Sequence, residues 1–177
     1  MVVKIMDDAP IKNGFYQSVT HGQLGVEDVI SYIKAFLEEE PDADYSLVIG
    51  TDSHEKSGRK GSKDVSLVTA VLVHRKGFGG KYFWKRITES NIHSLREKIY
   101  AETMTSINFA STFVPLLKKT LNGEMPDYNL EIHIDVGEHG DTRDMIKEVV
   151  GMVNGNGYVA KTKPEAYGAS YVADKHT

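Results

Sequence analysis

The sequence of 177 residues contains no cysteine. Disulfide bonds and cysteine-rich zinc sites are therefore excluded, and any metal site has to use oxygen or imidazole ligands. Carboxylate ligands favour hard ions such as Mg²⁺ or Mn²⁺. The beginning of the chain lacks the apolar run of a signal peptide, and no apolar stretch approaches the roughly 20 residues that span a bilayer. We therefore expect a soluble, cytoplasmic protein with no membrane partner.

Basic residues are fewer than acidic ones, 21 against 25, but they are unevenly distributed. The stretch from Glu55 to Lys98 holds eleven basic and four acidic residues, a balance of +7, which leaves −11 for the rest of the chain. This asymmetry is typical of a local phosphate-binding face, and equally of a lysine-rich hairpin exposed to solvent. We expect any nucleic-acid partner, whether RNA, hybrid or structured DNA, to bind through the basic region 56–98.

The hydrophobic pattern predicts one α/β domain preceded by an extension. Residues 1–24 show no clear period, and residues 25–40 have the apolar spacing of a helix, so we expect an N-terminal extension over 1–44 with one helix. From residue 45 to 177 the pattern predicts a mixed five-stranded sheet with helices on both faces, in which three antiparallel meander strands are followed by two parallel ones. The expected strands are 45–52, 65–75, 81–88, 130–136 and 158–163, and the expected helices are 94–121, 142–154 and 165–175.

Two aspartates each close an apolar strand. Asp52 ends the first strand of the domain in the run IGTDSH, and Asp135 ends the fourth in HIDVGEHGDT. Open α/β sheets place their ligand sites at this edge. Asp52 alone could simply cap the following turn. If the two strands lie side by side, however, their adjacent carboxylates require a shared proton or a cation.

Glu102 lies in the second turn of the long predicted helix, beside its apolar stripe. It could reach over the sheet edge, although an ordinary solvated glutamate is the commoner case. Glu97 points roughly 140° away from it around the helix. Asp174 lies in the last predicted helix, and no local pattern singles it out.

This order of strands, helices and acids resembles the ribonuclease H fold, and more narrowly the YkuK-type ribonuclease-H-like family of bacterial proteins. The resemblance covers most of the chain from Tyr45 to the end, and its segments are specific together although each is weak alone. They read LVIGTDSH, VLVHRKGFGG, SLREKIYAET, IHIDVGEHGDTRDMIKEVVGMV and KTKPEAYGASYVADKHT.

The resemblance implies a carboxylate quartet that binds two Mg²⁺ or Mn²⁺ ions about 3.5–4 Å apart. Asp52 would bridge both ions, Glu102 and Asp135 would hold one, and Asp174 the other. His139 is a candidate proton donor to the leaving group, with His176 as the alternative, although a surface role is the simpler interpretation for each histidine. Glu138 and Asp141 are further possible ligands, and Asp141 could instead cap a helix.

The third predicted strand carries Tyr82, Trp84 and Arg86 on one face. These side chains could stack on or hold a sugar-phosphate chain, or the two aromatic rings could pack under a helix.

Two functions remain open at this point. The first is a divalent-metal-dependent nuclease or related phosphodiester-processing enzyme. The alternative is a non-catalytic nucleic-acid-binding or adaptor protein that retains the fold. A nucleotide-dependent phosphotransferase of the actin and sugar-kinase type is disfavoured, because those proteins clasp the nucleotide between two such domains and no phosphate-binding glycine loop is present.

Overall fold

The computed structural model describes residues 14–56, 64–90, 92–122, 128–166 and 168–176. These residues form a seven-stranded mixed sheet with the strand order β2-β1-β5-β4-β3-β6-β7. The strands are β1 (Tyr16–Ser18), β2 (Gly22–Leu24), β3 (Tyr45–Lys56), β4 (Asp64–Arg75), β5 (Gly79–Ser90), β6 (Tyr128–His133) and β7 (Val159–Lys161). The helices are α2 (Val26–Glu38), α3 (Leu95–Leu121), α4 (Ile146–Gly155) and α5 (Gly168–Asp174), with a short 3-10 turn, η1 (Arg143–Met145), before α4.

The centre of the sheet confirms the predicted mixed α/β architecture. Strands β3, β4 and β5 form an antiparallel meander of twelve-residue strands. Strand β6 runs parallel to β3 from the Tyr45↔Tyr128 pair to the Gly50↔His133 pair, and β7 runs parallel to β6. The pairing of β3 with β6 therefore ends at Gly50. Beyond Gly50, β3 continues without β6 beside it, which leaves a gap in the sheet on this side of β3.

The predicted count of five strands is wrong, because the segment expected to be irregular supplies β1 and β2. Each of these strands has three residues, too few to show an alternating pattern in the sequence. They form a hairpin that joins the sheet where Gln17 pairs with Trp84 of β5.

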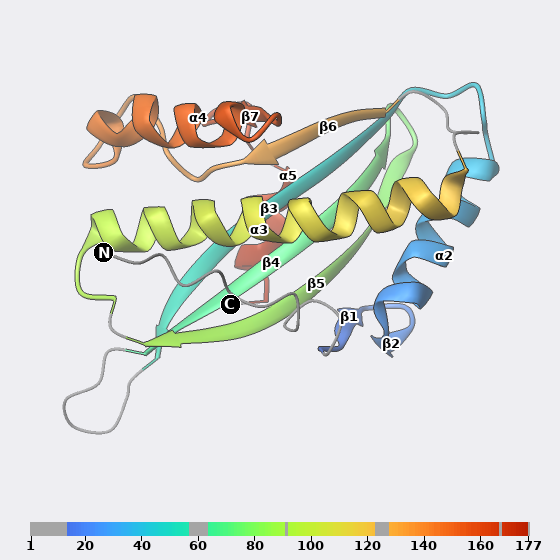
Figure 1. Ribbon diagram of the computed structural model, residues 1–177, viewed down its shortest axis with the longest axis horizontal. Coiled ribbons are helices and arrows are strands. Elements are labelled where there is room, and N and C mark those ends of the chain that lie inside the picture. The colour runs from blue at the N-terminus through green and yellow to red at the C-terminus, as the bar shows by residue number, and fades with distance from the viewer. Residues whose placement is uncertain (1–13, 57–63, 91, 123–127, 167, 177) are drawn as a thin grey trace.

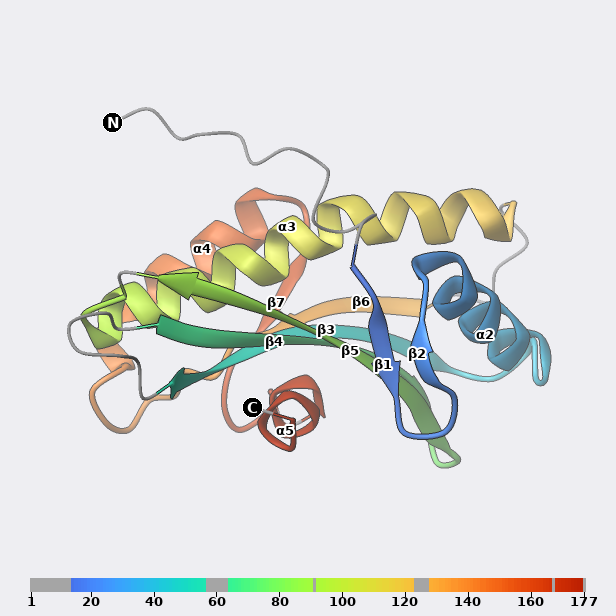
Figure 2. The same cartoon turned by 90° about the horizontal axis from the view of Figure 1, so that it is seen from below.

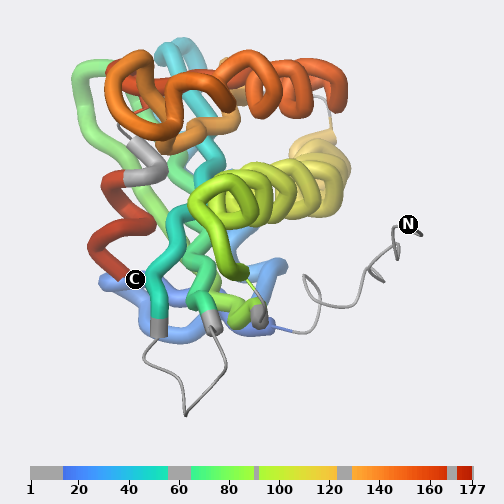
Figure 3. The backbone as a smooth tube through the Cα atoms, turned by 90° about the vertical axis from the view of Figure 1, so that its left-hand side faces the viewer, coloured from blue at the N-terminus to red at the C-terminus, as the bar shows by residue number. Residues whose placement is uncertain are grey.

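The helices cover both faces of the sheet. Figures 1 and 2 show α2, α3 and α4 on one face and α5 alone on the other. Seen from the end of the sheet, α3 and α5 lie on opposite sides of the β3–β4 pair (Figure 3). Among the described residues, no helix combines the length and apolar character needed to cross a membrane.

Helix α3 is the long element that carries Glu102. Its start is fixed by a capping box, in which the Ser94 hydroxyl accepts from the Glu97 amide and the Glu97 carboxylate accepts from the Ser94 amide. Asn122 ends the helix in the left-handed conformation, with φ of 49°. Pro115 lies inside the helix, on its exposed side, without splitting it. The predicted single helix over 94–121 is thus confirmed to within one residue.

The main apolar core lies between the sheet and α2, α3 and α4. It includes Tyr16 of β1, which is fully buried and contacts the rings of Phe109 and Phe113 on α3. A smaller cluster on the opposite face packs Val172 and Ala173 of α5 against β4. The N-terminal hairpin therefore shares the core of the sheet, while the domain boundary at residue 45 stays a prediction.

Candidate functional site

Asp52 lies within β3 and not at its end as predicted, because the strand continues beside β4 to Lys56. It lies just past the point where β6 ends. Its neighbours Thr51 and Ser53 both face α3, since Ser106 donates to Thr51 Oγ1 at 2.8 Å and Ser53 donates to Glu102. Side chains alternate along a strand, so Asp52 points to the other face, where α5 lies. The polar run that ends this strand thus serves two purposes: its hydroxyls hold α3, and its carboxylate faces α5.

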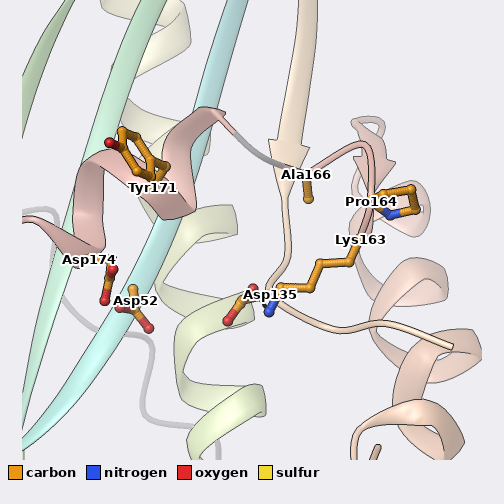
Figure 4. Close-up of a pocket in the computed structure, with 7 residues that line it drawn as sticks. All are labelled: Asp52, Asp135, Lys163, Pro164, Ala166, Tyr171 and Asp174. Atoms are coloured by element: carbon orange, nitrogen blue, oxygen red, sulfur yellow. Dashed lines mark ion pairs between the residues drawn. The ribbon is translucent and has the colours of Figure 1, made fainter. Parts of the chain in front are cut away.

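Asp135 lies beyond the end of β6, not within a strand as predicted. After His133 the chain separates from β3 and turns toward β7, where the Ile134 amide donates to the Lys161 carbonyl at 2.9 Å. This separation places the Asp135 carboxylate across the opening from Asp52 (Figure 4).

Asp174 is the last residue of α5 and lies beside Asp52 (Figure 4). The three aspartates come from three separate elements and line one pocket of about 380 Å³. Lys163, Pro164, Ala166 and Tyr171 complete its lining.

Glu102 does not line this pocket, but lies buried behind it with 3% of its surface exposed. It accepts a hydrogen bond of 2.6 Å from the Ser53 hydroxyl, and its Oε1 lies 3.9 Å from the Lys98 ammonium. Burial raises the pKa of Glu102 to about 7, with smaller contributions from the negative charges of Asp52 and Asp135. The predicted position beside the apolar stripe is therefore confirmed, and solvation of this side chain is excluded.

The pKa of Asp52 is also raised above its ordinary value. Burial is the main cause, and the charges of Asp135 and Asp174 raise it further, against the lowering effects of the Ser53 amide and Lys98. Asp52 is thus affected by the charges of Asp135 and Asp174, and Glu102 by those of Asp52 and Asp135. No three histidine, aspartate or glutamate side chains of the described residues are close enough together, as they are oriented, to hold one metal ion.

Lys163 is the pocket residue that the sequence did not reveal. Its ammonium lies 2.6 Å from Asp135 Oδ1 and neutralises that carboxylate. A single lysine in the run KTKPE has no recognisable pattern. Tyr171, which is largely exposed at the pocket, was missed for the same reason.

Neither candidate histidine lines the pocket. His139 is exposed in the loop after Asp135, as are Glu138 and Asp141. His176 follows α5 and stacks on the Trp84 indole, with the ring centroids 3.6 Å apart. Burial lowers the pKa of His176, so it is neutral at neutral pH. The proton-donor role and the ligand roles of Glu138 and Asp141 stay predictions.

The aromatic face of β5 packs inside the protein. Tyr82 and Trp84 contact the apolar cluster beneath α5, and Arg86 donates to the His176 carbonyl. Of the two interpretations of these side chains, the structure supports packing under a helix.

Several basic side chains of the region 56–98 are paired or buried in the described part of the chain. Arg75 and Lys81 pair with Glu39, Arg96 pairs with Glu148, and Lys98 pairs with Glu102. Lys85 is buried, with its ammonium 5.6 Å from the ring centroid of Tyr16. Arg59, Lys60 and Lys63 lie outside the described residues. Binding of nucleic acid through this region stays a prediction.

Comparison with known proteins identifies the family to which this protein belongs. The chain matches the ribonuclease H-like family over residues 28–177 and belongs to it, which confirms the resemblance seen in the sequence. It is 35% identical over 170 residues to the uncharacterized protein YkuK of Bacillus subtilis (strain 168), in a match that covers 92% of this chain and 96% of that protein. No solved structure matches the chain.

Proposed function

We propose that the chain is a divalent-metal-dependent nuclease, or a related phosphodiester-processing enzyme, that acts on RNA, an RNA–DNA hybrid or structured DNA. The pocket lined by Asp52, Asp135 and Asp174 is its centre, with Glu102 as the fourth acid behind it. Membership of the ribonuclease H-like family supports a function related to nucleic acids.

The observation that carries this proposal is the convergence of carboxylates from separate elements on one open pocket. Asp52 comes from β3, Asp135 from the loop after β6 and Asp174 from α5. Packing three acids together raises the free energy of the folded protein unless a cation or a proton neutralises them. Lys163 offsets part of this charge through its ion pair with Asp135, and a bound cation would offset the rest.

The chemistry of these residues fits Mg²⁺ or Mn²⁺. All four candidate ligands offer carboxylate oxygens, which such hard ions prefer, and the described residues of the pocket present no sulfur or imidazole ligand. Asp52, Glu102, Asp135 and Asp174 would hold the ions, and a bound ion would activate water and neutralise charge on the phosphodiester. Reorientation of the carboxylates on binding is required, because no three of them in the described structure are now placed to hold one ion.

Cleavage assays with purified protein test the proposal. A panel of labelled single-stranded RNA, RNA–DNA hybrid and four-way junction is incubated with Mn²⁺ and wild-type protein, Asp52→Asn or Asp135→Asn. We expect the wild type to cut at least one substrate, and both variants to be inactive because each lacks a metal ligand. Asp42→Asn, which removes an exposed acid remote from the pocket, is the matched control and should cut like the wild type.

Two results would contradict the nuclease. Cleavage that persists in Asp52→Asn would place the activity elsewhere or in a contaminant. Tight binding of these nucleic acids with no cleavage under any metal condition would instead support the non-catalytic adaptor.

A further inference from the structure

Lys163 is the one basic side chain among the described residues that line the pocket. Its ammonium is only 2.6 Å from Asp135 Oδ1, while its side chain keeps 57% of its surface exposed and that of Asp135 keeps 33%. The ion pair is therefore short but open to solvent, and it lies at the carboxylate where a divalent ion is proposed to bind.

The backbone holds Lys163 in this place. Its amide donates to the Val136 carbonyl at 2.8 Å, which ties the loop after β7 to the loop that carries Asp135. Gly137 permits the close approach, since a Cβ at that position would lie 3.3 Å from Lys163 Cβ. The lysine is thus anchored at its main chain, while its tip is held by the solvent-exposed ion pair with Asp135.

A bound divalent ion and the ammonium compete for the same carboxylate. One ammonium carries half the charge of a divalent ion and pairs with Asp135 alone, whereas the ion would also draw on the charges of Asp52 and Asp174. Metal binding at Asp135 would therefore release the lysine tip. Because the main chain of Lys163 is fixed, the released ammonium would stay at the rim of the same pocket, where it can pair with a phosphate oxygen.

We propose that Lys163 is a metal-gated phosphate ligand. In the metal-free protein it is the counter-ion of Asp135, and once a divalent ion takes over that carboxylate it binds the phosphodiester of the substrate. This inference rests on the proposed function and adds a substrate-binding residue to it. It also explains why the acids can stay together in the absence of metal.

The first arm of the test measures Mn²⁺ affinity by calorimetry for wild type, Lys163→Met and Lys163→Arg. Loss of the competing ammonium should tighten Mn²⁺ binding by about two- to five-fold, the factor that corresponds to a partly exposed ion pair. Lys163→Arg keeps the charge and should bind Mn²⁺ like the wild type. Lys34→Met is the matched control, because Lys34 is a lysine of α2 that pairs with Glu38, and neither residue lines the pocket.

The second arm measures nucleic-acid affinity with and without Ca²⁺, using the labelled panel member that wild type binds most tightly. With Ca²⁺, Lys163→Met should bind it about tenfold more weakly than wild type, as expected for one lost charge-assisted hydrogen bond. Without a divalent ion the two proteins should bind it alike, because the wild-type lysine is then held by Asp135.

Several outcomes would overturn the inference. Unchanged or weaker Mn²⁺ binding by Lys163→Met would show that the lysine does not compete with metal. An equal loss of nucleic-acid affinity with and without Ca²⁺ would make Lys163 a permanent contact and not a gated one. If the wild type binds neither Mn²⁺ nor any nucleic acid, the proposed function fails and this inference fails with it, whereas the first two results leave the proposed function intact.

Discussion

Glu102 is the acid of the site with the most unusual environment. It is almost fully buried, it accepts a hydrogen bond from Ser53, and burial raises its pKa to about 7. Near neutral pH the Glu102 carboxyl group is thus partly protonated and partly ionised. The apolar surroundings favour the protonated form, and a cation would favour the ionised form. Deprotonation of this one side chain would link the proposed metal binding to pH.

The pH dependence of stability follows from this shift. The folded pKa of about 7 lies above the ordinary value of 4.5, so the folded state binds the proton more tightly than the unfolded state. The resulting stabilisation is fully present below the ordinary value and is lost as the pH rises through the folded value. Between about pH 5 and about pH 8, metal-free wild type should lose roughly 2 kcal/mol of unfolding free energy relative to Glu102→Gln.

Urea denaturation of both proteins in the presence of a chelator measures this difference. Glutamine keeps the acceptor for Ser53 and carries no charge, so its stability should change less over the same pH range. A parallel pH dependence of the two proteins would show that Glu102 has an ordinary pKa. Mn²⁺ affinity of the wild type should rise over the same range, because only the deprotonated carboxylate is a ligand.

At the scale of elements, the placement of α5 decides whether Asp174 belongs to the site. This helix has seven residues, fewer than the roughly 12 that an isolated helix needs to be stable, so tertiary contacts must hold it. Val172 and Ala173 pack against β4 on one side, and His176 stacks on Trp84 just beyond the helix. The aromatic face of β5 therefore positions Asp174.

Removal of the stacking histidine should loosen α5. In His176→Ala we expect faster hydrogen exchange of the α5 amides and weaker Mn²⁺ binding, because Asp174 is held less firmly. The matched control is His21→Ala, which removes a histidine of the β1–β2 turn that stacks on Tyr32 of α2, with the ring centroids 4.0 Å apart, and makes no contact with α5 in the described structure. Unchanged exchange in α5 of His176→Ala, as measured by mass spectrometry, would contradict this positioning role.

The elements differ in how far the sequence could predict them. Strands β3 to β5 and helix α3 are long, so their periods are clear and their predicted ranges agree with the structure to within a few residues. The β1–β2 hairpin escaped detection because three-residue strands have no measurable period. Asp135 was predicted inside a strand, but β6 ends two residues earlier, where the chain turns toward β7.

The residues of the site also differ in how far the sequence could predict them. Strand-end position pointed to Asp52 and Asp135, and proximity to the apolar stripe pointed to Glu102, because these are local patterns. Asp174 came only from the family resemblance, since contacts of α5 with β3 and β4 bring it to the pocket. Lys163 could not be found, because its role depends on the course of two loops that meet only in the folded chain.

At the scale of the whole molecule, the N-terminal hairpin and the sheet share one core. Tyr16 of β1 is fully buried against Phe109 and Phe113 of α3, the helix that also carries Glu102. Its hydroxyl has no hydrogen-bond partner within the described part of the chain, so the ring provides the stabilisation and the hydroxyl adds none.

Two substitutions at this position separate these contributions. Tyr16→Ala should lower the unfolding free energy by about 3–5 kcal/mol, as for other large-to-small changes of a buried aromatic ring. Tyr16→Phe should remain within about 1 kcal/mol of the wild type or be more stable, because it removes an unpaired polar group. Urea denaturation gives both values. A loss in Tyr16→Phe as large as in Tyr16→Ala would mean that the hydroxyl has a partner after all.

A calorimetric titration of Mn²⁺ into metal-free protein tests most directly whether the pocket is a divalent-metal centre. Wild type should bind Mn²⁺ with measurable heat, and Asp52→Asn should bind it more weakly by more than about tenfold, the loss seen when even indirect supports of a ligand are removed. Asp42→Asn should bind it like the wild type. No binding by the wild type at millimolar Mn²⁺, or equal binding by Asp52→Asn, would contradict the metal centre.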